Sequence, residues 1–203
     1  MPHPHPEHGH AHGHLGNPDD FAAYLAKLDD PSRAAWQKPG AVIDALRIRP
    51  RDVVAEIGAG TAYFTRRLAR RAAHVFALEA DPAMFPVLAA RVAKLSNVSP
   101  VLVPPDAPRL PLRSVDLILM VASYHHLPGG PRYLKKLATL LRPGGRIANI
   151  DFHDRELPVG PRGHRISRER FLRDAARAGL RVSREHALLP YQYFVELKPA
   201  RGR

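Results

Sequence analysis

One stretch of the chain joins an apolar run, a glycine-rich turn and the start of a helix, and it constrains the fold more than any other. Residues 53–57 are apolar except for Glu56, and Gly58-Ala59-Gly60 follows directly. Gly58 and Gly60 let the backbone turn tightly and approach a ligand, and free N–H groups at the next helix start can bind it. A dinucleotide fingerprint would need Gly where Tyr63 stands, and a P-loop would need Gly-Lys-Ser/Thr, so neither motif fits. The stretch predicts a strand that ends at a ligand-binding turn, with Glu56 suited to a ligand that carries an amine.

From residue 52 onward, short apolar runs alternate with stretches that have the spacing of amphipathic helices. The runs are nearly continuous, as expected for parallel strands that helices cover on both faces. Only residues 189–191 separate the last two runs, which is too short for a crossover, so these runs must pair antiparallel. We therefore predict an α/β fold: a doubly wound, Rossmann-like, mostly parallel seven-stranded sheet that ends in an antiparallel hairpin. The expected strands are residues 53–57, 74–79, 98–103, 115–121, 146–152, 181–188 and 192–197, and the expected helices are residues 62–71, 82–94, 131–141 and 167–178.

Composition sets the beginning of the chain apart from the rest. Residues 1–18 alternate six histidines with Pro, Gly, Ala and Glu and hold almost no apolar side chains, so we expect a disordered His-rich tail. Imidazoles there, such as those of His8, His10, His12 and His14, can bind copper, nickel or zinc, but we predict no firm metal site. Residues 19–50 contain three short helical patterns and are expected to form an N-terminal helical cap on a domain over residues 51–199.

Composition also excludes several classes of chemistry and location. The chain has no cysteine, which excludes disulfides, thiolate nucleophiles and Cys-ligated zinc or iron–sulfur clusters. No secretory signal and no 18-residue apolar run is visible, so we expect a cytoplasmic protein without a membrane span. The net charge is +12, but the basic residues are mostly arginine in a chain rich in Ala and Pro. We therefore expect solvated arginines on helix faces, and nucleic acid is an unlikely partner.

Residues 53–65 resemble motif I of class I S-adenosylmethionine (SAM)-dependent methyltransferases, an acidic-x-Gly-x-Gly-x-Gly pattern in which Ala62 replaces the third Gly. Further family landmarks follow in order at residues 75–79, 105–107, 110–118 and 141–146, where Gly144 and Gly145 permit positive φ. The resemblance covers about residues 52–198 and implies the methyltransferase version of the fold with SAM as cofactor. It implies that Gly58, Ala59, Gly60 and Thr61 cradle the methionine part, that Glu56 orients the turn and the amino group, that Glu79 with Ala80 holds the ribose, and that Asp106 with Ala107 meets the adenine.

The segment Tyr124-His125-His126-Leu127 resembles that of a subgroup of small, stand-alone enzymes, which are similar to ubiquinone-biosynthesis-type methyltransferases in size and motif I. It follows the expected strand 115–121, so both histidines lie at the carboxyl edge of the sheet, where open α/β sheets bind ligands. Histidine titrates near neutral pH, which makes His125 and His126 the candidate catalytic bases. The expected substrate pocket consists of Tyr124, Asp151, His153 and Tyr191, with Trp36, Tyr63 and Tyr193 as further candidate walls.

Three functions fit these observations. The favoured one is methyl transfer from SAM to a small-molecule acceptor by a monomer or homodimer. The second is a metal-binding or metal-delivery protein that uses the His-rich head; a further metal set would be His125 or His126 with Asp151, His153 and His164, although a polar substrate rim without metal is preferred. The third is an RNA-modifying methyltransferase that uses the basic C-terminal part.

Overall fold

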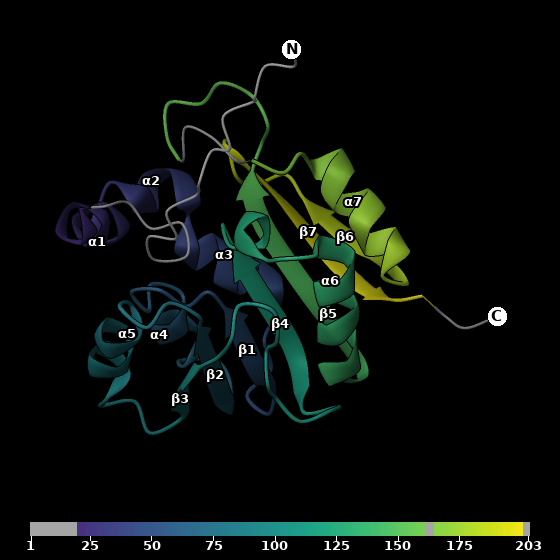
Figure 1. The fold of residues 1–203 in the computed structure, drawn as a ribbon, viewed down its shortest axis with the longest axis horizontal. Helices are drawn as coiled ribbons and strands as arrows, with labels where there is room; N and C mark the ends of the chain where they lie inside the picture. Colours follow the sequence, from purple (N-terminus) through teal and green to yellow (C-terminus); the bar gives the residue numbers. More distant parts are fainter. Residues whose placement is uncertain (1–19, 161–164, 201–203) are drawn as a thin grey trace, which may run out of the picture.

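The computed structural model describes residues 20–160 and 165–200, in which seven strands form one sheet with helices on both faces (Figure 1). The strand order is β3-β2-β1-β4-β5-β7-β6, and β7 runs antiparallel to both of its neighbours. This confirms the expected doubly wound, mostly parallel sheet with a terminal hairpin. The strands are β1 (Val53–Ile57), β2 (His74–Glu79), β3 (Val98–Leu102), β4 (Val115–Val121), β5 (Leu141–Phe152), β6 (Leu180–His186) and β7 (Gln192–Pro199).

Helices cover both faces of the sheet because its central strands are apolar on both sides. Leu117, Ile118, Leu119 and Met120 of β4 are completely buried. Side chains of α3, α4 and α5 pack on one face, and side chains of α6 and α7 pack on the other. The helices are α1 (Phe21–Asp29), α2 (Arg33–Gln37), α3 (Pro39–Leu46), α4 (Thr65–Leu68), α5 (Phe85–Val92), α6 (Gly130–Leu140) and α7 (Arg168–Arg177), with a 3₁₀ turn, η2 (Tyr124–His126), after β4.

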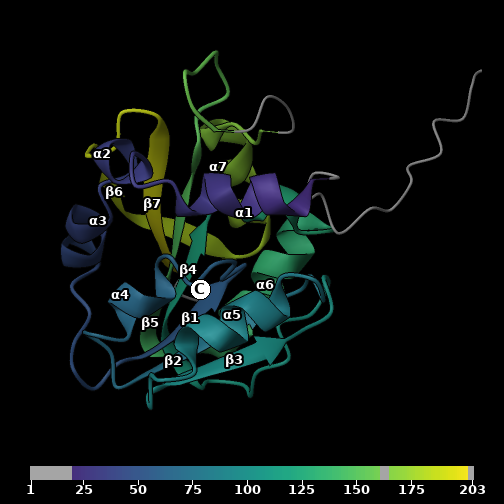
Figure 2. The same cartoon turned by 90° about the vertical axis from the view of Figure 1, so that its left-hand side faces the viewer.

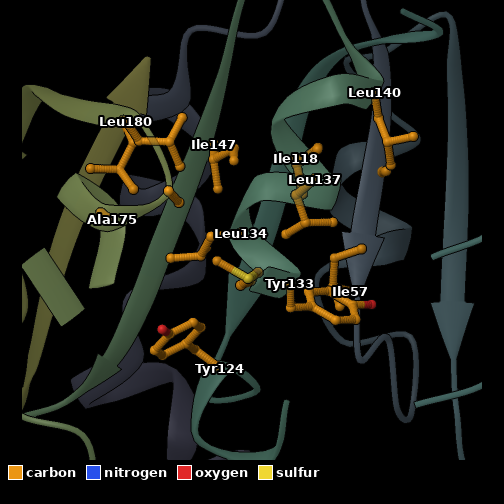
Figure 3. Packing of buried hydrophobic residues seen from close by; sticks show 14 of the residues in the cluster. Ile57, Ile118, Tyr124, Tyr133, Leu134, Leu137, Leu140, Ile147, Ala175 and Leu180 are labelled. Carbon is orange, nitrogen blue, oxygen red and sulfur yellow. The ribbon is translucent and has the colours of Figure 1, made fainter. Parts of the chain in front are cut away.

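The α6 helix shows how the helical spacing fixes one of these layers. Leu134, Leu137 and Leu140 recur every three residues and lie on the buried side of the helix. Figure 3 shows these leucines in the same buried cluster as Ile118 of β4 and Ile147 of β5. Removing these side chains from water contributes about 1.5–3 kcal/mol each, which holds α6 against β4 and β5.

The helix expected from residue 62 is shorter than predicted. Ala62 has φ +61°, a left-handed conformation that does not belong to an α-helix. The helix α4 therefore begins only at Thr65. This is the position where the family pattern has glycine, the residue that adopts positive φ without a Cβ penalty. The expectation of a regular helix from Ala62 is therefore wrong, because the glycine-rich turn extends three residues further.

The Pro-Gly-Gly turn lies within the bounds of β5 rather than before it. The pairing of β4 with β5 passes from Val115–Leu141 directly to Leu117–Arg146, so the turn loops out of the ladder between these pairs. Gly144 has the expected positive φ, +83°, whereas Gly145 is not among the positive-φ residues. A Cβ on Gly145 would stand 3.0 Å from the carbonyl oxygen of Arg142, so this glycine permits a close backbone approach instead.

The segment expected as the cap, residues 19–50, contains the three helices α1, α2 and α3, and its role as a cap on the domain stays a prediction. The side chain of Asp20 caps α1 by accepting a hydrogen bond from the Ala23 N–H. Trp36 of α2 packs on Phe152 at the end of β5, with ring centroids 5.7 Å apart. In both views α1 lies above α5 (Figures 1 and 2). The expected disordered tail, residues 1–18, lies outside the described residues. Within residues 20–160 and 165–200, no helix is both long enough and apolar enough to cross a membrane.

Candidate active site

The glycine-rich turn places β1 directly beside the segment that follows β4. Gly58 has φ +73°, and a Cβ on it would stand 2.9 Å from Cβ of Ser123. Gly60 has φ +52°, and a Cβ on it would meet nothing within 4 Å. The first glycine is therefore required for close packing, and the second leaves open space beside its backbone.

The carboxylate of Glu79, at the end of β2, is held against this turn. Its Oε2 accepts a hydrogen bond from the Gly60 N–H at 2.8 Å, and its Oε1 accepts from the N–H groups of Ala80 at 2.8 Å and Asp81 at 3.0 Å. An ionised carboxylate has about four acceptor positions, so lone-pair capacity remains for a hydroxyl of a ligand. Glu79 lies about 20 residues after the turn in sequence, and only the parallel pairing of β1 with β2 brings the two together.

Glu56 is a second buried carboxyl group on the adjacent strand β1. Its Oε2 accepts a hydrogen bond of 2.5 Å from the Thr65 hydroxyl at the start of α4. Burial raises the pKa of Glu56 to about 8, and the opposing effects of the Thr65 hydrogen bond and the Arg33 charge are smaller. A cation that arrives beside this group favours its ionised form, so Glu56 is suited to a positively charged ligand.

The helical cap is tied to the turn by one ion pair. Arg91 of α5 contacts both carboxylate oxygens of Asp29, at the end of α1, at 2.5 Å, and it also donates to the Thr61 carbonyl oxygen at 3.2 Å. The hydrogen bond from Arg91 lowers the pKa of the Asp29 carboxyl group. Tyr24 of α1 lies close to Glu79: burial, followed by the Glu79 charge, raises the pKa of its hydroxyl.

Arg33 of α2 is the residue near this turn that sequence reasoning missed. Its guanidinium carbon lies 4.3 Å from the centroid of the Tyr63 ring, and it donates to the Leu28 carbonyl oxygen at 2.9 Å and to the Gln37 side chain. It makes no ion pair with the described part of the chain. Burial lowers its pKa, and the Glu56 charge is among the smaller effects that raise it. A guanidinium has five N–H donors, so donors remain available for an anion. The Ser-Arg-Ala-Ala-Trp stretch gave no motif for it; the contact with Tyr63 depends on how α2 folds over the turn.

The two candidate histidines after β4 differ in their surroundings. Nδ1 of His125 lies 3.1 Å from Oδ2 of Asp151, and their side chains are 4% and 1% exposed. Oδ1 of Asp151 accepts a hydrogen bond of 2.8 Å from the Phe152 N–H, which fixes the carboxylate. His126 is exposed, and its ring centroid lies 4.0 Å from that of His125. The geometry can hold a proton on Nδ1 of His125 and leave Nε2 as the acceptor.

Of the expected pocket residues, Asp151 contacts His125, and the other three have different neighbours. His153 lies near Tyr193, with ring centroids 6.0 Å apart, and burial followed by the Arg155 charge lowers its pKa. Tyr191 packs beside Trp36, with ring centroids 6.4 Å apart. Tyr124 instead points into the core, where its hydroxyl donates to Asp174 at 3.0 Å. A pocket role for these side chains stays a prediction.

The residues expected to contact adenine have other partners in the structure. Asp106 is exposed, with Oδ2 3.8 Å from Nζ of Lys136, and the Ala107 N–H donates to the Pro104 carbonyl oxygen at 3.2 Å. Their contact with adenine stays a prediction. Among the described residues, no group of three or more His, Asp or Glu side chains could hold a metal. His164 and the head residues His8, His10, His12 and His14 lie outside the described residues.

The sequence is similar to known methyltransferases. A methyltransferase domain family matches residues 55–149. The chain is 30% identical over 128 residues to a demethylmenaquinone methyltransferase from Tropheryma whipplei, an alignment that covers 63% of this chain and 52% of that protein. The chain therefore spans about half the length of the curated relatives it matches.

Solved structures are similar over most of the chain. A SAM-dependent methyltransferase from Aquifex aeolicus superposes with a TM-score of 0.80 and 25% identity, covering 86% of this chain and 96% of that one. The complex of DhpI with SAH superposes with a TM-score of 0.70 and 20% identity, covering 89% and 92% of the two chains, and it shows a likeness of fold.

Proposed function

The chain belongs to the class I SAM-dependent methyltransferases, and from this premise we propose that it transfers the methyl group of SAM to a small-molecule acceptor by in-line displacement. The observation that carries the proposal is the pair of buried carboxyl groups, Glu56 and Glu79, on neighbouring strands beside the open backbone of Gly60. Two carboxyl groups beside open backbone suit a ligand that carries hydroxyl groups and also a positive charge.

The side chains at the turn fit SAM group by group. Glu79 can accept hydrogen bonds from ribose hydroxyls, and Glu56 can accept the charge of the ammonium group. Arg33 lacks an acidic partner in the described residues and is suited to the carboxylate of the methionine part. The buried hydroxyl of Ser123 has no hydrogen-bond partner there and lies next to Gly58, which also fits a polar ligand.

When bound, SAM supplies an electrophilic methyl group on a positively charged sulfur. The chain contributes orientation and exclusion of water, since an in-line displacement needs the two reacting atoms aligned. An acceptor that carries a proton on oxygen, nitrogen or carbon also needs a base. We assign that task to Nε2 of His125, with Asp151 as the positioning residue that holds the ring.

Demethylmenaquinone, in its reduced quinol form, is the first acceptor to test, because the similar protein from Tropheryma whipplei is a demethylmenaquinone methyltransferase. A quinol carries an acidic hydroxyl, and removal of its proton makes the ring a carbon nucleophile, so it suits a histidine base. The measurement is formation of S-adenosylhomocysteine with and without the quinol. Turnover of the quinol supports the proposal, and turnover of an RNA substrate in its place would contradict the assignment to small molecules.

Replacing Glu79 with alanine is expected to weaken SAM binding by roughly 1–3 kcal/mol, about 5- to 150-fold, because charge-assisted hydrogen bonds to the ribose are lost. Isothermal titration calorimetry measures the change. Because Glu79 also holds three backbone N–H groups, Glu79→Gln, which keeps the size and one acceptor oxygen, separates ligand contacts from local unfolding. Unchanged affinity in both variants would show that the ribose lies elsewhere.

Replacing Arg33 with methionine, which keeps an apolar stem against Tyr63, is expected to weaken SAM binding by about 10-fold, since one charge-assisted contact to the carboxylate is lost. Binding of 5′-methylthioadenosine, which has the same nucleoside but no amino-acid part, is expected to stay the same. The Glu79 variants provide the matched comparison, because they should weaken both ligands. Equal losses for both ligands in Arg33→Met would show that Arg33 supports the cap rather than the carboxylate.

A further inference from the structure

Two hollows lie side by side at the amino-terminal edge of the parallel strands, the edge opposite the glycine-rich turn. The first has a volume of about 410 Å³, and its basic lining residues are Arg47, Arg49, Arg146, Arg184 and Lys198. The second has a volume of about 560 Å³, and its basic lining residues are Arg113, Arg142, Arg181 and Lys198. Gly144 and Lys198 line both hollows, so together they form one surface, the basic groove.

Positive charge in the basic groove exceeds the negative charge that could neutralise it. Eight basic side chains line it, and three carboxylates pair with some of them: Glu196 with Arg146 at 2.7 Å, Asp52 with Arg49 at 2.8 Å, and Asp116 with Arg142 at 3.0 Å. Glu196 is only 2% exposed and also contacts His186 at 2.7 Å, so its charge is already used beneath the surface. Within the described chain, Arg113, Arg181, Arg184 and Lys198 make no ion pair.

Regular structure holds these charges in place. Arg181 and Arg184 are exposed side chains of β6, and Lys198 lies on the neighbouring strand β7. Arg146 of β5 is anchored by Glu196 and by the carbonyl oxygen of Leu46. The sequence predicted scattered arginines on helix faces. In the structure, the arginines of the basic groove come from four separate segments, residues 47–49, 113, 142–146 and 181–184, and line one concave surface.

The lining indicates which anion would fit. None of the side chains that line the two hollows is aromatic, so the groove has no surface on which an exposed base could stack. Its partners are instead suited to phosphate groups, which bind arginine through paired N–H donors. A concave row of phosphate sites follows a curved, linear polyanion better than a flat bilayer.

We propose that the basic groove binds the phosphate backbone of a nucleic acid duplex, without reading its sequence. This changes our expectation that nucleic acid is an unlikely partner, and it goes beyond the proposed methyl transfer. Because the groove lies at the edge opposite Glu56 and Glu79, the duplex would tether the enzyme rather than serve as the methyl acceptor.

Fluorescence anisotropy with a labelled 20-base-pair RNA duplex at 50, 100 and 200 mM NaCl tests the proposal on the full chain. The test variant is Arg181→Gln/Arg184→Gln, which removes one exposed charge from each hollow. The matched control is Arg70→Gln/Arg173→Gln, which removes two exposed arginines outside the groove and leaves the same net charge. We expect about 10-fold weaker duplex binding for the test variant only, and a slope of log K against log salt that falls by about 1.8, as two lost phosphate contacts require.

Three results would overturn the proposal: no duplex binding by the wild-type chain at 50 mM salt, equal losses in the two variants, or groove-dependent binding to vesicles with anionic lipid in place of the duplex. Tighter binding of single-stranded poly(U) than of the duplex would overturn the duplex assignment. S-adenosylhomocysteine formation should be equal in the test variant and the wild type. That readout separates failure of the groove proposal from failure of the proposed enzyme activity.

Discussion

His125→Ala is expected to lower kcat for methyl transfer to the quinol by about 100- to 10,000-fold, the usual contribution of a positioned general base. Nδ1 of His125 is held by Asp151, so Nε2 is the nitrogen left to take the proton. SAM affinity is expected to change by less than about threefold, because this histidine is assigned to the acceptor side. Initial rates of S-adenosylhomocysteine formation and calorimetric titration with SAM measure the two effects separately.

Two further variants distinguish a base from a structural histidine. Asp151→Asn presents an amide to Nδ1 and favours the wrong tautomer, so it should lower kcat while the fold is kept. His126→Ala is the neighbouring control, and its loss of kcat should be smaller because His126 is exposed. Added imidazole should restore part of the rate in His125→Ala. Equal loss of rate and SAM affinity, with no restoration by imidazole, would contradict the assignment.

Glu56→Gln is expected to stabilise the free protein increasingly as the pH rises. Burial raises the pKa of Glu56 to about 8, above the ordinary 4.5 of an exposed glutamate. Between these values the folded state binds more protons than the unfolded state, so the free energy of unfolding falls as the pH rises. The free energy of unfolding of the wild type falls by about 1.4 kcal/mol for each pH unit above pH 5, and the fall levels off near pH 8. The variant has no carboxyl group to ionise at this position, so its free energy of unfolding does not fall in this way.

Urea denaturation at pH 5.5, 6.5 and 7.5, without ligand, measures this difference between Glu56→Gln and the wild type. Glu156→Gln, which changes an exposed carboxylate, is the control, and its difference should not grow with pH. SAM should oppose the effect, because its positive charge favours ionised Glu56 and so releases a proton on binding. A difference that does not depend on pH would show that Glu56 is already ionised in the free protein.

Much of the sheet was predictable because each central strand is its own signal. The bounds of β1, β2 and β4 match the expected residues, since a strand buried on both faces is mostly apolar. Glu56 and Glu79 could be singled out for the same reason: each is a carboxyl group in or at the end of an apolar run. Helix starts were less predictable, because Ala62 carries no local signal for its left-handed conformation.

Contacts between distant segments needed the three-dimensional structure. Asp151 lies 26 residues after His125 and pairs with it because β5 adjoins β4. The sequence placed both residues at the same edge but could not choose between His125 and His126, since local spacing does not determine which ring turns toward the neighbouring strand. Arg33 reaches Tyr63 only because α2 folds back over the turn.

The sequence by itself determined the α/β class, the terminal antiparallel hairpin and the residues of the glycine-rich turn, because these depend on short-range patterns of apolar and glycine residues. The tertiary structure alone decided that His125 meets Asp151, how deeply Glu56 is buried and where the unpaired arginines collect. Burial and ion pairing arise from segments that meet after folding, so their energies depend on distances that no local pattern contains.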